Sequence, residues 1–261
     1  MMFADLRRVV AMLLLLGAWA SRSQAAQGLN LAWGTCFGEG PAVQNVVFAC
    51  DTNAGKDRLT GSFVLAATIP TASGVESTVE VFSASNSLPA WWQFRNPGSC
   101  RRLSLIANGS VDPDWQHCVD WAVSGAGVLP LYCTAESPCG VGPIAANQGR
   151  VLVVGAVTQE EAVDLPPAQE FFAFNLVIDH ANTAGSAACG GCSIPACILL
   201  SSIAVESTTL ARYVIDTPTV QGSNVVTWQG GSIPVTRATA GCPAATPLRN
   251  STWGSLKSLY R

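Results

Sequence analysis

The sequence has little charge and very little histidine. Only 12% of its 261 residues are charged, and there are two histidines. The 14 basic and 17 acidic residues give a net charge of −3, so the composition offers no basic patch for a nucleic-acid backbone. Hydrophobic residues make up 49% of the chain, which excludes extensive intrinsic disorder and supplies material for a large core.

Familiar catalytic motifs are also missing. The chain has no Gly-x-Ser-x-Gly elbow, no His-Glu-x-x-His motif and no glycine-rich phosphate loop. Only His117 and His180 could serve as a base, and Asp179 would point to the opposite face of a strand from His180. We therefore expect no cofactor, no metal ion and no catalytic activity. A hydrolase stays open, because a pair of carboxylates can come from many acidic residues. These are Asp112, Asp114, Asp120, Glu160, Glu161, Asp164 and Glu170.

The N-terminus carries one short apolar run. Arg7 and Arg8 precede the run, residues 9–20, and small and polar residues follow it. This order is typical of a secretory signal peptide, and the run is too short to span a bilayer. We expect residues 1–26 to be removed, leaving no transmembrane span, and the mature protein to be secreted or held at the cell surface. An uncleaved anchor helix is the alternative.

Ten cysteines follow the predicted signal peptide. An even number of cysteines in an exported chain is typical of disulfides, because bridges persist in an oxidising compartment. The disulfide candidates are Cys36, Cys50, Cys100, Cys118, Cys133, Cys139, Cys189, Cys192, Cys197 and Cys242. Short-range pairing would tie local loops and predicts Cys36–Cys50, Cys100–Cys118 and Cys133–Cys139, although spacing alone does not fix the connectivity.

The segment Cys189-Gly-Gly-Cys192 has the spacing of a redox-active pair. With Cys197 and Cys242 it could instead supply four thiolates to zinc. A redox motif opens a helix, whereas Pro195 and a predicted strand follow here, and export disfavours free thiolates. We interpret the segment as a disulfide-linked turn, with redox chemistry and zinc as the alternatives.

Alternating hydrophobic residues predict strands through most of the chain. The pattern is clearest in residues 171–180 and 197–207. It recurs in residues 62–70 and 75–83. A nearly continuous apolar run of strand length lies at 151–157, and short strands are expected at 103–107, 213–216 and 224–228. Ser73-Gly74 is expected to turn a hairpin between the strands at 62–70 and 75–83. A short helix is expected at residues 112–123, a single turn at 159–163, and a terminal amphipathic turn or two through Trp253, Leu256 and Tyr260.

These elements predict an all-β fold, an antiparallel β-sandwich of jelly-roll type with long disulfide-stapled loops. One domain is expected to span residues 27–245, followed by a C-terminal tail at 246–261. The centre of the core is expected to contain one face of each of the two clearest strands. These residues are Phe172, Phe174, Leu176 and Ile178, facing Leu199, Ile203 and Val205.

Tryptophan is the strongest hint of a binding surface. All but Trp19 of the eight tryptophans lie beyond the predicted signal peptide. Flat aromatic rings on a rigid β scaffold can stack on sugar rings, so Trp91, Trp92 and Trp121 are candidate carbohydrate-binding residues. In the alternative interpretation, these large side chains cap the hydrophobic core.

The C-terminal residues Thr252–Arg261 read TWGSLKSLYR. They resemble the Thr-Trp-Gly-x-x-Lys-x-Leu-Tyr-Arg ending of a group of uncharacterised secreted proteins from environmental bacteria. The cysteines at 189, 192 and 197 and the residues Trp228–Gly231 resemble the same group. Its sandwich is similar in outline to cohesin-type and carbohydrate-binding modules, which implies a cohesin-like fold but no site residue. The tail is either a sorting or attachment signal or a final segment that docks on the domain or hangs free.

The sequence thus predicts a secreted, non-catalytic binding or structural protein of the cell envelope or extracellular space. Its partner is expected to be a protein or a polysaccharide, and not a nucleic acid. A carbohydrate-binding module that uses exposed tryptophans is the first alternative, and a secreted hydrolase is the second.

Overall fold

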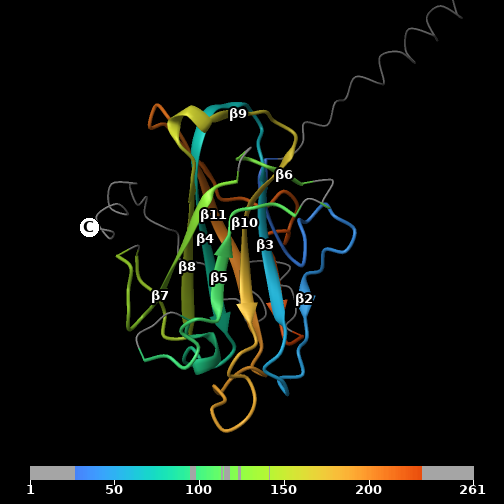
Figure 1. Ribbon diagram of the computed structural model, residues 1–261, viewed down its shortest axis with the longest axis vertical. Coiled ribbons are helices and arrows are strands. Elements are labelled where there is room, and N and C mark those ends of the chain that lie inside the picture. Colours follow the sequence, from blue (N-terminus) through green and yellow to red (C-terminus); the bar gives the residue numbers. More distant parts are fainter. Residues whose placement is uncertain are drawn as a thin grey trace, which may run out of the picture.

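The computed structural model describes residues 27–94, 98–112, 114, 118–122, 125–140 and 142–230. Two β-sheets pack face to face, as the predicted β-sandwich requires (Figure 1). The predicted signal peptide, the tail at 246–261, His117 and Cys242 lie outside the described residues. Within the described ranges, no helix is long and apolar enough to cross a membrane.

Five described strands form the first sheet. Its order is β1-β3-β10-β5, and β6 pairs with β10 beyond the end of β5. The strands are β1 (Gly28–Trp33), β3 (Lys56–Val64), β5 (Leu105–Asn108), β6 (Cys118–Asp120) and β10 (Glu170–Asp179). Neighbours run antiparallel except β6 and β10, which are parallel.

Eight described strands form the second sheet. Its order is β2-β13-β11-β4-β8-β7, with β12 paired to β11 and β9 paired to β4. The strands are β2 (Asn45–Val46), β4 (Ile69–Ser83), β7 (Gly127–Thr134), β8 (Gln148–Ala156), β9 (Val163–Leu165), β11 (Ala196–Ser207), β12 (Arg212–Ile215) and β13 (Val225–Trp228). The two short 3-10 helices are η1 (Ala90–Trp92) and η2 (Gln159–Glu161), the second at the predicted single turn.

The predicted hairpin at Ser73-Gly74 is wrong. Strand β4 continues through both residues, and Gly74 pairs with Glu206 on one side and Ala156 on the other. These two ladders keep the glycine extended in the middle of a sheet. The chain turns earlier, at residues 65–68, and β3 and β4 enter different sheets. In the range predicted as a helix, residues 112–123, the structure has strand β6 instead.

A β-bulge in β10 changes the predicted core. The register shifts between Phe172 and Phe174, and an extra residue reverses which side chains point inward. Phe174, Leu176 and Ile178 lie in the main core as predicted. Phe172, on the other side of the bulge, packs instead in a separate cluster with Cys36 and Cys118.

Strand β11 has the same irregularity between Leu200 and Ser202. Beyond it, Ile203 and Val205 point into the core as predicted. Before it, Ile198 and Leu200 point inward, so Leu199 lies on the outer face of the eight-stranded sheet. The simple alternation read from the sequence therefore holds on only one side of each bulge.

Candidate functional site

Disulfides tie together the loops at one end of the sandwich. We call this the stapled end; it comprises loops 49–55, 84–104 and 180–195 and lies at the bottom of Figure 1. The bridges Cys50–Cys192 and Cys100–Cys189 have Cα–Cα distances of 5.9 and 6.2 Å. The Cys-Gly-Gly-Cys turn is therefore linked to two other loops and is not closed on itself.

Disulfide connectivity differs from the predicted short-range set. Cys133–Cys139 is confirmed. Cys36 pairs with Cys118, across 82 residues and near the opposite end. The predicted pairs Cys36–Cys50 and Cys100–Cys118 are wrong, because a sandwich brings segments together that are far apart in sequence.

None of the described cysteines is free, and Cys197 is also disulfide-bonded. The redox and zinc interpretations of Cys189 and Cys192 are therefore wrong, since both sulfurs are held in bridges. The described part of the chain contains no group of three or more histidine, cysteine or acidic residues arranged to hold a metal ion.

Four tryptophans fill the inside of the stapled end. Trp33, Trp91, Trp92 and Trp228 form what we call the aromatic plug, and each is at most 1% exposed. Trp91 stacks on Trp228 with a centroid distance of 4.8 Å, and Trp92 meets Trp91 edge-on at 4.9 Å. Trp228 Nε1 donates to the Cys192 carbonyl at 2.7 Å, and Trp91 Nε1 donates to Thr183 Oγ1 at 3.0 Å. The plug is thus hydrogen-bonded to loop 180–195 of the stapled end.

The predicted carbohydrate platform is not present at these tryptophans. Trp91 and Trp92 are 0% exposed and Trp121 is 1% exposed. A ring that is buried has no face open to a sugar. The structure places all three in the core, which is the alternative that the sequence left open.

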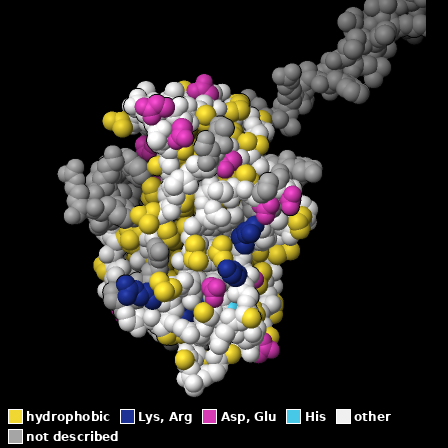
Figure 2. Space-filling view, viewed as in Figure 1, with side chains coloured by type: hydrophobic (Ala, Val, Ile, Leu, Met, Phe, Trp, Pro, Cys, Tyr) yellow, Lys and Arg dark blue, Asp and Glu magenta, His cyan; other side chains and the backbone are white. Residues whose placement is uncertain are grey.

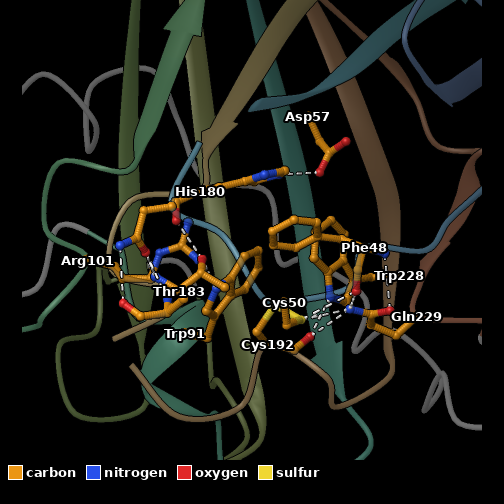
Figure 3. Close-up of a disulfide and its surroundings, with 12 residues drawn as sticks. Phe48, Cys50, Asp57, Trp91, Arg101, His180, Thr183, Cys192, Trp228 and Gln229 are labelled. Atoms are coloured by element: carbon orange, nitrogen blue, oxygen red, sulfur yellow. Dashed lines mark hydrogen bonds and ion pairs between the residues drawn. A yellow bond between two sulfur atoms is a disulfide. The ribbon is translucent and has the colours of Figure 1, made fainter. Parts of the chain in front are cut away.

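His180 lies beside the aromatic plug, and its ring points toward Asp57 (Figure 3). Both of its ring nitrogens have partners within the protein. Nε2 is 2.7 Å from Asp57 Oδ2, and Nδ1 is 3.2 Å from the Ala54 carbonyl oxygen. The ring stacks on Phe48 at 3.9 Å. No ring nitrogen is left to take a proton from a nucleophile, so the arrangement fits a structural link between β10 and β3.

Sequence reasoning missed the partner of His180. It considered the neighbour Asp179, whereas the strand register places Asp57 opposite Ile178, two residues before the histidine. Asp57 is 123 residues away from His180 in sequence, and the residues around Asp57 form no motif that points to a histidine partner. Only the pairing of β3 with β10 brings the two side chains together.

Arg101 covers the other face of the plug. Its Cζ lies 3.7 Å from the centroid of the Trp91 ring, a cation–π contact, and the residue is 1% exposed. Nη2 donates to the main-chain oxygen of Asp179, while Nε and Nη1 have no hydrogen-bond partner. Burial lowers the pKa of Arg101 to about 9, and the nearby charge of Asp179 partly opposes this shift.

A surface hollow of about 430 Å³ lies over this region, between loop 99–104 and the end of β10. Arg102, Leu103, Asp179 and Asn182 contribute to its lining. Asn182 Nδ2 donates to the Cys100 carbonyl at 2.6 Å, which adds to the Cys100–Cys189 bridge in fixing the rim. Leu103 is 84% exposed. On the face shown in Figure 2, charged side chains are few and scattered.

Buried carboxylates elsewhere have partners within the protein. Glu80 and Arg150 are each 1% exposed and 2.7 Å apart, and burial raises the pKa of Glu80 in spite of the arginine. Near the opposite end, Arg212 binds Glu76 and Glu206 at 3.1 and 2.5 Å. These contacts hold strands together.

The hydrolase alternative needs two carboxylates that converge in one hollow. The hollow at the stapled end has Asp179 in its lining. A second hollow, of about 310 Å³ near the opposite end, has Glu206, which is paired with Arg212. Each of these two hollows thus presents a single carboxylate.

Comparisons with known proteins give only a similarity in outline. No family model matches the chain, and no curated protein matches it in sequence. Among solved structures, the second type II cohesin module of the cellulosomal adaptor scaffoldin ScaA from Acetivibrio cellulolyticus has a TM-score of 0.34 at 7% identity, covering 74% of this chain and 92% of that one.

A second solved structure is the cohesin module of a Clostridium perfringens family 33 glycoside hydrolase. It has a TM-score of 0.32 at 6% identity and covers 77% of this chain and 93% of its own. The predicted cohesin-like outline agrees with both matches, but scores this low carry no argument about function. The resemblance to secreted proteins with a Thr-Trp-Gly ending stays a prediction.

Proposed function

We propose that this chain is a secreted, non-catalytic binding or structural protein of the cell envelope or extracellular space. The observation that carries the proposal is the cross-linking of loops by long-range disulfides, above all Cys50–Cys192 and Cys100–Cys189. Such bridges persist in oxidising compartments, which supports export with residues 1–26 as the signal peptide. Residues 27–245 are then the exported domain, with a tail at 246–261.

The state of the ionisable groups supports a non-catalytic role. His180 uses both ring nitrogens on protein oxygens, and Glu80 is fixed by Arg150. Glu170 accepts hydrogen bonds from Asn30 and Ser62. A catalytic acid or base needs an open hydrogen-bonding position toward its substrate. These groups are instead hydrogen-bonded to other residues of the protein.

The stapled end is the best-supported binding surface. Its loops are fixed by bridges, so they lose little conformational freedom when a partner binds. The hollow combines an exposed leucine, Leu103, with the polar side chains Arg102 and Asn182. A mixed apolar and polar surface of this kind favours a protein partner over a polysaccharide, which would need exposed aromatic rings.

The first test is the mass of the intact protein recovered from the growth medium or cell surface, measured with and without reduction. We expect residues 1–26 to be absent and each bridge to add two hydrogens on reduction. A retained N-terminal segment or free thiols at Cys50 and Cys192 would contradict the proposal.

The second test compares two exposed leucines at opposite ends of the sandwich. Leu103 is 84% exposed at the stapled end, and Leu210 is 79% exposed near the other. Once cross-linking has identified a partner of the wild-type protein, we expect Leu103→Asp to weaken its binding about tenfold or more. The matched control Leu210→Asp should bind as the wild type does. Equal binding by both variants would remove the stapled end as the binding surface.

A further inference from the structure

A second apolar cluster lies on the outer face of the eight-stranded sheet. It consists of Phe82, Cys197, Leu199 and Val225, which we call the outer cluster. The register pairs Cys197 with Phe82 and Leu199 with Val225, so all four share one face. Ile198, between two of them, points into the main core. The outer cluster therefore faces away from the other sheet.

These side chains are nevertheless buried, at 2 to 8% exposure. A sheet face that is not packed against a second layer is normally solvated and polar, so burial requires a covering segment. Around Cys133 on the same sheet, Ile144 from a loop packs against the buried cluster. Within the described part of the chain, no partly buried hydrophobic residue packs against the outer cluster in this way.

The disulfides indicate what covers it. The sequence has ten cysteines, and eight of them pair with one another in four bridges. Cys197 is disulfide-bonded as well. One cysteine of the sequence, Cys242, is left to bond with it. We propose that a Cys197–Cys242 disulfide holds residues 231–245 against the outer cluster.

Chain geometry and composition support this occupant. The described part ends at Gly230, just after β13, and β13 pairs with β11 so that Thr227 lies opposite Cys197. The twelve residues 231–242 lead from Gly230 to Cys242. They can span up to about 40 Å, far more than the distance between neighbouring strands. The segment includes the apolar sequence Ile233-Pro234-Val235.

Peptide mapping of the oxidised, full-length protein tests the bridge directly. Trypsin alone leaves Cys189, Cys192 and Cys197 on one peptide, residues 151–212, because no lysine or arginine lies between Arg150 and Arg212. A second digestion with thermolysin, which can cut before Ala196, separates Cys197 from the other two. We expect a linked pair of peptides containing Cys197 and Cys242 that disappears on reduction.

Limited trypsin digestion of the folded protein gives an independent readout. Cleavage after Arg237 and Arg249 yields a fragment, residues 238–249, that contains Cys242. In the wild type this fragment should stay attached until a reductant is added. In Cys242→Ser it should be released at once, and Cys197→Ser/Cys242→Ser, which leaves no unpaired thiol, is the matched control that should behave the same way.

Three results would overturn the proposal. They are a free thiol at Cys242, a Cys242 peptide linked to any cysteine other than Cys197 of the same chain, and release of the fragment from the wild type without reductant. A covalent dimer on a non-reducing gel would also overturn it, because Cys242 would then be bonded to a cysteine of another chain. If the variants fail to fold, the wild-type mapping alone still decides.

Discussion

The two ends of the sandwich are held together by different interactions. At the stapled end, two bridges join three loops over the aromatic plug. At the opposite end, Arg212 joins Glu76 on β4 to Glu206 on β11, and the Thr158–Glu161 capping box closes η2. One bridge, Cys36–Cys118, joins β6 to the loop after β1 near this end.

This difference follows from the lengths of the connections. Near the opposite end the chain turns within residues 65–68 and 207–211, so strand pairing continues almost to the turn. At the stapled end, loops 84–104 and 180–195 make few ladder hydrogen bonds and must be ordered by other means. Covalent links and large buried rings are therefore placed where backbone pairing is missing. The four predictions below test this comparison.

Removing the Cys50–Cys192 bridge should have the largest effect. This bridge closes a loop of 142 residues, and the chain-entropy relation assigns it on the order of 5 kcal/mol of unfolding free energy. The Cys133–Cys139 bridge closes a loop of 6 residues and should contribute about 2 kcal/mol. Denaturant unfolding of Cys50→Ser/Cys192→Ser and of Cys133→Ser/Cys139→Ser measures both. Equal losses would show that loop length does not explain the stapling.

Truncating the plug should have the next largest effect. Trp228→Ala removes a fully buried ring that contacts Trp33, Trp91 and Trp92, and should lower the unfolding free energy by about 3–5 kcal/mol. Trp228→Phe keeps part of the packing and should lose clearly less in the same denaturant titration. If both variants lose the same amount, the Nε1 hydrogen bond to Cys192 and not ring packing holds the plug.

The Asp57–His180 pair should contribute a smaller amount. Asp57→Ala leaves the His180 ring, which is 7% exposed, without one of its partners and should cost about 1–3 kcal/mol. Asp112→Ala breaks the neighbouring Arg58–Asp112 pair, which is 42% and 34% exposed, and should cost well under about 1 kcal/mol. Thermal or denaturant unfolding of the two variants gives the comparison. A cost for Asp57→Ala no larger than that for Asp112→Ala would mean that the pair does not lock the stapled end.

Arg101 should give the smallest effect at neutral pH. Arg101→Met loses the contact with Trp91 but also removes a buried charge with two unpartnered nitrogens, so we expect a net change within about 1 kcal/mol. The folded-state pKa of about 9 lies well below the ordinary value for arginine, so above pH 9 the unfolded chain binds more protons than the folded one. The wild type should therefore gain stability relative to Arg101→Met between pH 8 and 10. A difference that stays constant over this range would contradict the lowered pKa.

Much of the strand pattern was visible in the sequence. The alternating segments at 171–180 and 197–207 became β10 and β11, and the apolar run at 151–157 lies within β8 with its last residue just beyond the strand. Periodicity reports local backbone geometry, which neighbouring residues largely fix. It did not reveal the bulges at Phe172 and Leu200, because a bulge depends on the partner strand.

The site was much less predictable. The tryptophans at 91 and 92 were predicted as a carbohydrate platform but are buried, because a sequence does not say whether a large ring points into the core or into solvent. Asp57 and Arg101 carried no motif at all. Both became notable only through the residues that lie next to them, His180 and Trp91.

The sequence by itself determined that this is an all-β protein with disulfide-linked loops, because side-chain alternation and cysteine number are properties of the chain alone. The tertiary structure decided which cysteines pair, that the tryptophans form a plug, and that Leu199 faces outward. Those outcomes depend on contacts between residues many tens of positions apart. Such contacts arise only when the two sheets pack, and no local pattern records them.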